Sequence, residues 1–230
     1  MIKNKVKRIF SIIITMILIL IPSIAAAKTP IIIDGYFDDW SDKPHTAFYY
    51  DIYNSEEIKN VALFCDDTTI YGHIKMSEMD GKFGSFTIYL NINNSYTIEL
   101  VILCTDSNNE VDWDKSILDL QQGTHFNVAV FNNKDYTALL GDAALLVHNN
   151  NYKPGDDIEF SIKYDKIKEY CNNIPFNEVN DITLTCPSLG SQSITIAGTF
   201  TEPFLGIIIT LTFIGIVLLY RKYKQTGKSI

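Results

Sequence analysis

The stretch Ile158-Glu-Phe-Ser-Ile-Lys163 alternates apolar and polar side chains at every second position. In an extended chain, successive side chains point to opposite faces of the sheet. The three apolar side chains would therefore share one face, and the three polar ones, Glu159 among them, would share the other. This pattern predicts a strand with one face in an apolar core and the other face in water.

Runs of the same kind, rich in Ile, Val, Tyr, Phe and Thr, extend to both sides and are separated by Asn, Asp and Gly. Their spacing and turn-rich connections predict an all-β fold, a jelly-roll-like β-sandwich. One short helix is expected at 165–171, because Ile167 and Tyr170 could share a face there. The expected strands are 31–34, 47–53, 60–65, 70–75, 85–92, 96–104, 126–131, 143–147, 158–163, 182–185 and 193–200.

The N-terminus has the three parts of a secretory signal peptide. Four basic residues within 3–8 precede an apolar run over 9–21, and an Ala-x-Ala cleavage site follows at 25–27. We therefore expect signal peptidase to remove residues 1–27 and the remainder to be exported. Export argues against a cytoplasmic enzyme or a nuclear protein.

A second apolar segment, 204–220, contains no charged residue. As a helix it would be about 26 Å long, near the lower limit for crossing a bilayer. The basic residues that follow it predict, by the positive-inside rule, that the tail 221–230 stays in the cytoplasm. The expected protein is thus a single-pass type I protein of the cell membrane, with one extracellular domain, 28–200.

The string TEPFLGIIITLTFIGIVLLYRKYK, residues 201–224, resembles the Firmicu-CTERM sorting domain of Gram-positive bacteria, with its Pro-Phe-x-Gly entry, short helix and Arg-Lys finish. The resemblance implies processing by an exosortase-family membrane enzyme. The residues of the sorting motif are Pro203, Phe204, Gly206, Arg221 and Lys222. An ordinary stop-transfer anchor is the alternative. No Leu-Pro-x-Thr-Gly motif is present, which argues against attachment by an ordinary sortase.

The expected extracellular domain is strongly acidic, with 11 basic and 26 acidic residues and a net charge of −15. Affinity for nucleic acid comes mainly from Lys and Arg that displace counterions, so nucleic acid is not an expected partner. Divalent cations suit such a surface better.

Oxygen-bearing side chains occupy every second position of DSNNEVDWD, residues 106–114. If this stretch is a loop, alternate side chains could converge on Ca²⁺, which takes six to eight oxygen ligands. On an edge strand, the same spacing would only give a charged, solvated face. The candidate ligands of calcium, the one cofactor suggested, are Asp106, Asn108, Glu110, Asp112 and Asp114.

Three further segments, in this order, resemble family 9 carbohydrate-binding modules and related DOMON-like sandwiches. They are IIIDGYFDDW at 31–40, VALFCDDTTIYGHIKM at 61–76 and GDDIEFSIKYDKI at 155–167. The resemblance implies the sandwich fold and a polysaccharide ligand, although folds of this kind host unrelated functions.

The two tryptophans have different expected roles. Asp34, Gly35 and Trp40 are expected to be structural, with Gly35 in a backbone conformation that other residues avoid and Trp40 closing one end of the sandwich. A sugar-stacking Trp40 is the alternative. Trp113 lies in a stretch too polar for a buried strand. It is the candidate to stack on a pyranose ring, and the alternative is that it covers the edge of the core.

Four cysteines remain outside the signal peptide: Cys65, Cys104, Cys171 and Cys186. An even number in an exported domain permits two disulfides. Their positions at the ends of strands and loops favour the pairs 65–104 and 171–186. Four buried thiols are the alternative.

Nothing in the sequence supports an enzyme. It contains no Gly-x-Ser-x-Gly elbow, no Gly-rich phosphate loop and no Cys-x-x-Cys pair, and its four His lack the spacing of metal ligands. The expectation is a non-catalytic surface protein that binds a glycan at the cell envelope. A structural or adhesive protein that binds another protein is the second hypothesis, and a glycoside hydrolase is the third.

Overall fold

The computed structural model describes residues 30–51, 53, 57–78, 81–148, 154–170, 179 and 181–197. The expected signal peptide, sorting segment and cytoplasmic tail lie outside these residues. Within the described ranges, no helix is both long enough and apolar enough to cross a membrane.

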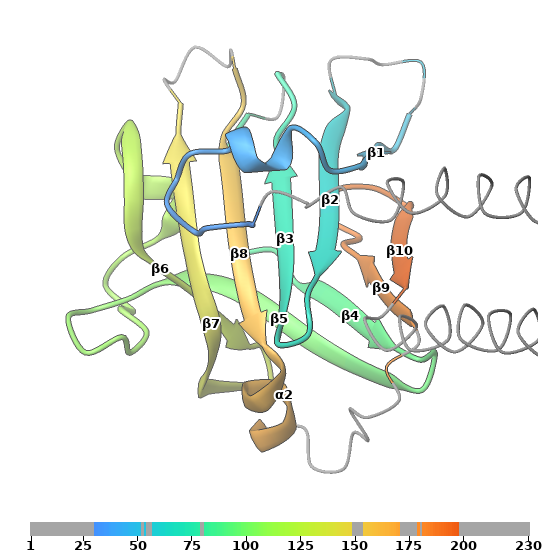
Figure 1. Ribbon diagram of the computed structural model, residues 1–230. Coiled ribbons are helices and arrows are strands. Elements are labelled where there is room, and N and C mark those ends of the chain that lie inside the picture. Colours follow the sequence, from blue (N-terminus) through green and yellow to red (C-terminus); the bar gives the residue numbers. More distant parts are fainter. Residues whose placement is uncertain are drawn as a thin grey trace, which may run out of the picture. The chain divides into compact units, whose positions relative to one another are not determined.

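In the described ranges, ten strands form one sheet in the order β1-β2-β3-β8-β7-β6-β5-β4-β9-β10 (Figure 1). All the described strand pairs are antiparallel. The strands are β1 (His45–Phe48), β2 (Lys59–Cys65), β3 (Thr69–Lys75), β4 (Ile88–Ile92), β5 (Tyr96–Cys104), β6 (Gly123–Asn132), β7 (Asp135–Val147), β8 (Asp157–Lys163), β9 (Asp181–Thr185) and β10 (Ser193–Ala197). The prediction of an all-β fold is confirmed.

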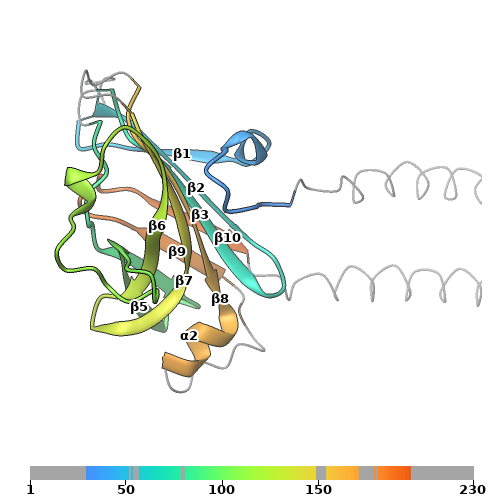
Figure 2. The same cartoon turned by 90° about the vertical axis from the view of Figure 1, so that its left-hand side faces the viewer.

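The sheet bends back on itself, so that its two halves face each other across the core. In Figures 1 and 2, β2, β3, β8 and β7 form one layer, and β4, β5 and β9 lie behind it. The pairing of the long strands β6 and β7 has three register shifts, a feature that increases local bending and twist. β10 also contacts β1 and β2, so the sheet nearly closes. The expected sandwich is thus built from one continuous sheet.

The core is filled from the inward positions of the strands, and β8 shows the pattern most clearly. Its Ile158, Phe160 and Ile162 are fully buried, as the alternation predicts. Phe160 fills the space beside Gly72 on β3, where a Cβ atom would come within 2.2 Å of the Phe160 ring. The short helix α2 (Tyr164–Tyr170) follows directly and buries Ile167, which confirms the predicted helix within one residue.

The strand expected at 31–34 is wrong. Residues 32–44, called the strap below, cross the outer face of β8 and β3 as an irregular segment with one short 3-10 helix, η1 (Asp38–Trp40) (Figure 1). The backbone N–H groups of Asp34 and Gly35 donate to the side chain of Glu159 instead of to a neighbouring strand. Because the Glu159 side chain accepts these N–H groups, the segment satisfies part of its backbone without pairing with a strand.

The outer face of β8 is also buried where the sequence predicts water. Glu159 is 0% exposed and accepts hydrogen bonds from the strap, and Ser161 is 5% exposed. Lys163, at the end of β8, is exposed as predicted. The part of this face around Glu159 is therefore an interface between the strap and the sheet.

The expected disulfide between Cys65 and Cys104 is wrong, because the two cysteines are not joined to each other. Cys65 ends β2 and Cys104 ends β5, and these strands are not neighbours in the sheet. The Cys65 thiol instead donates to the carbonyl oxygen of Ala197 at 3.6 Å. Cys186 is also a buried free thiol, and its expected partner Cys171 lies outside the described residues. The three described cysteines follow the buried-thiol alternative.

Candidate functional site

A long connection, residues 105–122, joins β5 to β6 and carries the predicted ligand and metal residues. Its first part is a hairpin, because Thr105 pairs with Val111 and the backbone N–H of Asp112 donates to the Cys104 carbonyl at 2.9 Å. Val111 packs on a small apolar cluster of β5, β6 and β7. That cluster contains Val101, Leu103, Ala129, Phe131 and Leu139. The hairpin is therefore anchored on the sheet.

Trp113 follows this hairpin and is 70% exposed. Its ring meets that of Tyr136, near the start of β7, in an edge-to-face arrangement with centroids 5.2 Å apart and planes at 89°. Tyr136 is 40% exposed, and its hydroxyl donates to Oδ1 of Asn133 at 3.1 Å. The two rings form an exposed right-angled corner. Trp113 is thus not a cover for the edge of the core.

Polar groups lie beside this aromatic corner. The carboxylate of Asp112 is 2.7 Å from the ammonium group of Lys115, and the hydrogen bond from Lys115 holds the pKa of Asp112 below its ordinary value. The side-chain amide of Asn133 donates to the Thr87 hydroxyl at 3.3 Å. The corner therefore combines apolar ring surface with hydrogen-bonding groups that are held in place.

Two of the five proposed calcium ligands, Asp106 and Asp112, already have partners within their own turn. Oδ1 of Asp106 accepts the backbone N–H groups of Asn108 at 2.8 Å and Glu110 at 3.0 Å. Asp112 pairs with Lys115, and the backbone N–H of Asp114 donates to Asp112 at 3.2 Å. In the part of the chain that the structure describes, no three His, Cys, Asp or Glu side chains are grouped to hold a metal ion. Calcium at this loop stays a prediction, and these contacts give it no support.

The second part of the same connection forms one wall of a polar cavity of about 330 Å³. Lys82 donates to the Leu118 carbonyl at 3.2 Å. The buried carboxylate of Asp156 accepts the backbone N–H groups of Phe83 and His148, both at 2.9 Å, and so fixes the opposite wall. The lining residues are Lys82, Leu118, Asp119, Leu120, Gln121, Gln122 and His148. This cavity could not be predicted from the sequence, because its walls come from three distant segments.

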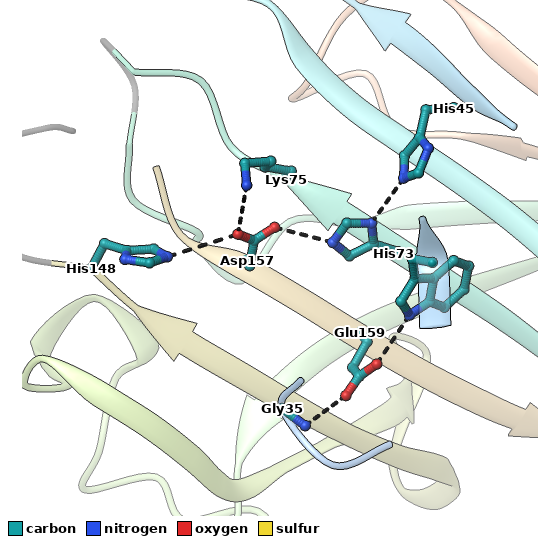
Figure 3. Close-up of polar contacts among 8 residues, drawn as sticks. Gly35, His45, His73, Lys75, His148, Asp157 and Glu159 are labelled. Atoms are coloured by element: carbon teal, nitrogen blue, oxygen red, sulfur yellow. Dashed lines mark hydrogen bonds and ion pairs between the residues drawn. The ribbon is translucent and has the colours of Figure 1, made fainter. Parts of the chain in front are cut away.

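Glu159, on β8 under the strap, binds both halves of the segment 31–40 (Figure 3). Its Oε1 accepts the backbone N–H groups of Asp34 at 2.9 Å and Gly35 at 2.7 Å, and its Oε2 accepts the indole N–H of Trp40 at 3.0 Å. Gly35 has φ of +72°, and a Cβ atom there would lie 2.4 Å from Thr124. Only glycine fits this position without strain. The three residues expected to be structural therefore meet at one carboxyl group.

Trp40 is 1% exposed, but it packs on the outer face of the sheet and not at one end of the sandwich. Its ring stacks on that of His73, and Phe37 stacks on the same His73, each with centroids 5.3 Å apart. His73 Nε2 forms a hydrogen bond with Asp157 at 3.0 Å, and His73 Nδ1 is 3.3 Å from Nε2 of His45. The strap thus covers a buried histidine as well as Glu159.

Asp157 connects His73 to two more basic groups (Figure 3). Its Oδ2 lies 3.1 Å from the Lys75 ammonium group and 3.7 Å from Nε2 of His148. Burial acts to raise the pKa of Asp157, but the hydrogen bond from His73 and the charge of Lys75 outweigh it, so the pKa lies below its ordinary value. Burial lowers the pKa of His45, and the neighbouring His73 adds to that effect.

The residues of the sorting motif, Pro203, Phe204, Gly206, Arg221 and Lys222, lie outside the described residues. Comparisons with known protein families, with curated proteins and with solved structures find no match to this chain. Both family resemblances therefore rest on the quoted segments of sequence alone.

Proposed function

We propose that this chain is a non-catalytic surface protein that binds a glycan of the cell envelope or its surroundings through Trp113 and Tyr136. The observation that carries the proposal is the exposed right-angled corner formed by these two rings. A pyranose ring has an apolar C–H face and a rim of hydroxyl groups, so it needs a flat apolar partner with polar groups beside it.

The corner meets both needs. One sugar face can lie on the exposed indole of Trp113, while Tyr136 stands at a right angle and limits how the ring can turn. Asn133, which accepts the Tyr136 hydroxyl, and Asp112, the residue before Trp113 in the chain, can form hydrogen bonds with sugar hydroxyls. Because Val111 anchors the hairpin on the sheet, little freedom of Trp113 is lost on binding, which favours affinity.

The place of action follows from the two ends of the chain. We propose that signal peptidase removes residues 1–27, that 204–220 inserts in the cell membrane of a Gram-positive bacterium, and that an exosortase-family enzyme processes the segment 201–224. The domain that carries Trp113 would then face outward, where extracellular polysaccharide is available. Its net charge of −15 fits a neutral glycan better than nucleic acid.

A glycan array probed with the full chain in detergent micelles tests the binding proposal. We expect the unaltered chain to bind at least one class of polysaccharide, and Trp113→Ala to weaken that binding at least about tenfold. Tyr36→Ala is the matched control, because Tyr36 is 72% exposed but lies on the strap. If no glycan binds, or if Tyr36→Ala weakens binding as much as Trp113→Ala, the proposal is wrong and binding of a protein partner becomes the leading hypothesis.

A further inference from the structure

The polar cavity lined by 118–122, Lys82 and His148 is preformed, because residues next to its walls are buried in the core. Ile117 is 4% exposed and precedes the first of these walls, and Phe83 is 1% exposed and follows Lys82. A preformed cavity loses little freedom when a ligand binds. Its volume of about 330 Å³ lies at the lower end of the range for small-molecule sites, about 300–1,000 Å³.

The register of the sheet places the cavity at one end of two neighbouring strands. Gly123, the first residue of β6, pairs with Val147, the last residue of β7. Gln122 and His148 are the next residues along the chain beyond this pair, so the ends of β6 and β7 bring them to the same rim. Ligand sites are common at such a place, the mouth of a sheet that closes on itself.

The lining offers both donors and acceptors of hydrogen bonds to a ligand. The ammonium group of Lys82 donates to the Leu118 carbonyl at 3.2 Å, and among the described residues it forms no ion pair with a carboxylate. The carboxylate of Asp119 and the side-chain amide of Gln122 form no hydrogen bond within the same ranges. These three side chains therefore have donors and acceptors available for a ligand.

This mixed set of polar groups favours one chemical class of ligand. An anion would face the carboxylate of Asp119, and a cation would face the ammonium group of Lys82. A neutral ligand with many hydroxyl groups fits both, because a hydroxyl group can donate to Asp119 and can accept from Lys82 or Gln122. Sugar units are neutral ligands of this kind.

The cavity is close to the aromatic corner along the chain. Trp113 and Leu118 belong to the same connection between β5 and β6, and the five steps from one to the other span at most about 18 Å when fully extended. A short oligosaccharide can extend over a distance of this size. One glycan chain can therefore reach from the corner to the cavity.

We propose that this cavity is a second glycan subsite, which holds neutral sugar units of the same glycan chain that stacks on Trp113. This inference rests on the proposed function of the corner formed by Trp113 and Tyr136. The corner alone takes one sugar ring, whereas the corner and the cavity together select a glycan by its length. The ligand is then a neutral oligosaccharide of several units rather than a free monosaccharide.

A series of oligosaccharides of increasing length tests the second subsite. The probes are the di- to hexasaccharides of the neutral polysaccharide that the array selects, titrated by calorimetry into the full chain in micelles. We expect the hexasaccharide to bind at least about tenfold more tightly than the disaccharide. Trp113→Ala should weaken the binding of every member, because each needs the stacking ring.

A double variant, Asp119→Ala with Gln122→Ala, separates the cavity from the corner. Neither side chain forms a hydrogen bond among the described residues, so the fold should be kept, which far-UV circular dichroism checks. We expect this variant to bind the disaccharide as the unaltered chain does and to lose the tighter binding of the hexasaccharide. Asp67→Ala is the matched control, because it removes the same charge from an exposed position between β2 and β3.

The His148 ring gives a second readout that needs no change to the polar groups of the cavity. In proton NMR of the full chain, the hexasaccharide should shift the ring C–H resonances of His148 and the disaccharide should leave them in place, with His148→Gln used only to assign them. A bound hexasaccharide that leaves these resonances unchanged would contradict the second subsite.

The outcomes separate this inference from the proposed function. Equal binding of the disaccharide and the hexasaccharide, a double variant that keeps the difference, or the same loss in Asp67→Ala would overturn the second subsite and leave the Trp113 site standing. Selection of charged glycans alone on the array would overturn the neutral class. If no glycan binds, the proposed function is wrong and the second subsite is wrong with it.

Discussion

Trp40 and Trp113 have the same side chain and opposite surroundings. Trp40 is 1% exposed, stacks on His73 and donates its indole N–H to Glu159. Trp113 is 70% exposed and touches Tyr136 edge to face. At the scale of the residue, burial and a buried hydrogen bond thus assign one tryptophan to stability and leave the other available to a ligand.

The two tryptophans should therefore differ in their effect on stability. Trp40→Ala removes a buried ring and leaves Glu159 short of a donor, so we expect it to lower the free energy of unfolding by roughly 3–5 kcal/mol. Trp113→Ala should lower it by no more than about 1 kcal/mol, the value of an edge-to-face pair. Urea denaturation followed by far-UV circular dichroism measures both, with Trp40→Phe as the conservative control. Similar losses for Trp40→Ala and Trp113→Ala would refute this assignment.

Asp157 should contribute to stability in a pH-dependent way. Its carboxylate accepts from His73 and Lys75, so we expect Asp157→Asn to lower the free energy of unfolding at pH 7 by about 1–3 kcal/mol. Because the pKa of Asp157 is lowered by folding, this contribution is present above 3.8 and is lost as the pH falls through the lower folded pKa. Asp114→Asn, at an exposed position, is the control. The idea fails if the loss caused by Asp157→Asn is the same at pH 3 and pH 7.

The strap is the element that the sequence misrepresents. Its Ile-rich start predicts a strand, but its hydrogen-bond acceptor is Glu159, 125 positions after Asp34. By contrast, the strand predicted at 96–104 has the bounds of β5, and the asparagine-rich turn after β4 contains Asn93 and Asn94 at φ of 54° and 53°. Local alternation and turn residues are readable from sequence, whereas a long-range side-chain acceptor is not.

The same reason explains which parts of the candidate sites were predictable. Trp113 could be found because its exposure follows from the polar residues around it. The cluster of His73 and Asp157 could not, since the register of β3 against β8 places them together although the chain separates them by 84 positions. The alternation in β8 does place Asp157 and Glu159 on one face. Two acidic residues on the same face of one strand were the one sign in the sequence that this face contacts other polar groups.

A substitution at Gly35 tests how closely the strap packs on Thr124 of β6. Alanine there must adopt φ of +72° and meet Thr124, so we expect Gly35→Ala to lower the free energy of unfolding by more than about 1 kcal/mol. Gly123→Ala is the matched control, because Gly123 also has a positive φ but nothing lies within 4 Å of its added Cβ. Equal losses for the two variants, measured by thermal melts, would mean that the strap does not press on β6.

At the scale of the whole molecule, the proposed function needs a domain that faces outward and a C-terminal segment that an enzyme processes. If a dedicated enzyme reads the Pro-Phe-x-Gly motif, the double variant Pro203→Ala with Phe204→Ala should still reach the membrane in the native host but keep its C-terminal tail. Mass spectrometry of the protein isolated from that host identifies its C-terminus. An unaltered chain that still carries Arg221 and Lys222 would show that the segment is an ordinary anchor.

The most direct test of glycan binding follows the two indole N–H groups by ¹⁵N NMR, with Trp113→Phe to assign them. The full chain, in micelles, is titrated with the oligosaccharide that gives the strongest signal on the array. We predict that the Trp113 resonance shifts and saturates, while the resonance of the buried Trp40 stays in place. Saturable binding of the oligosaccharide without any change at Trp113 would contradict the proposed site.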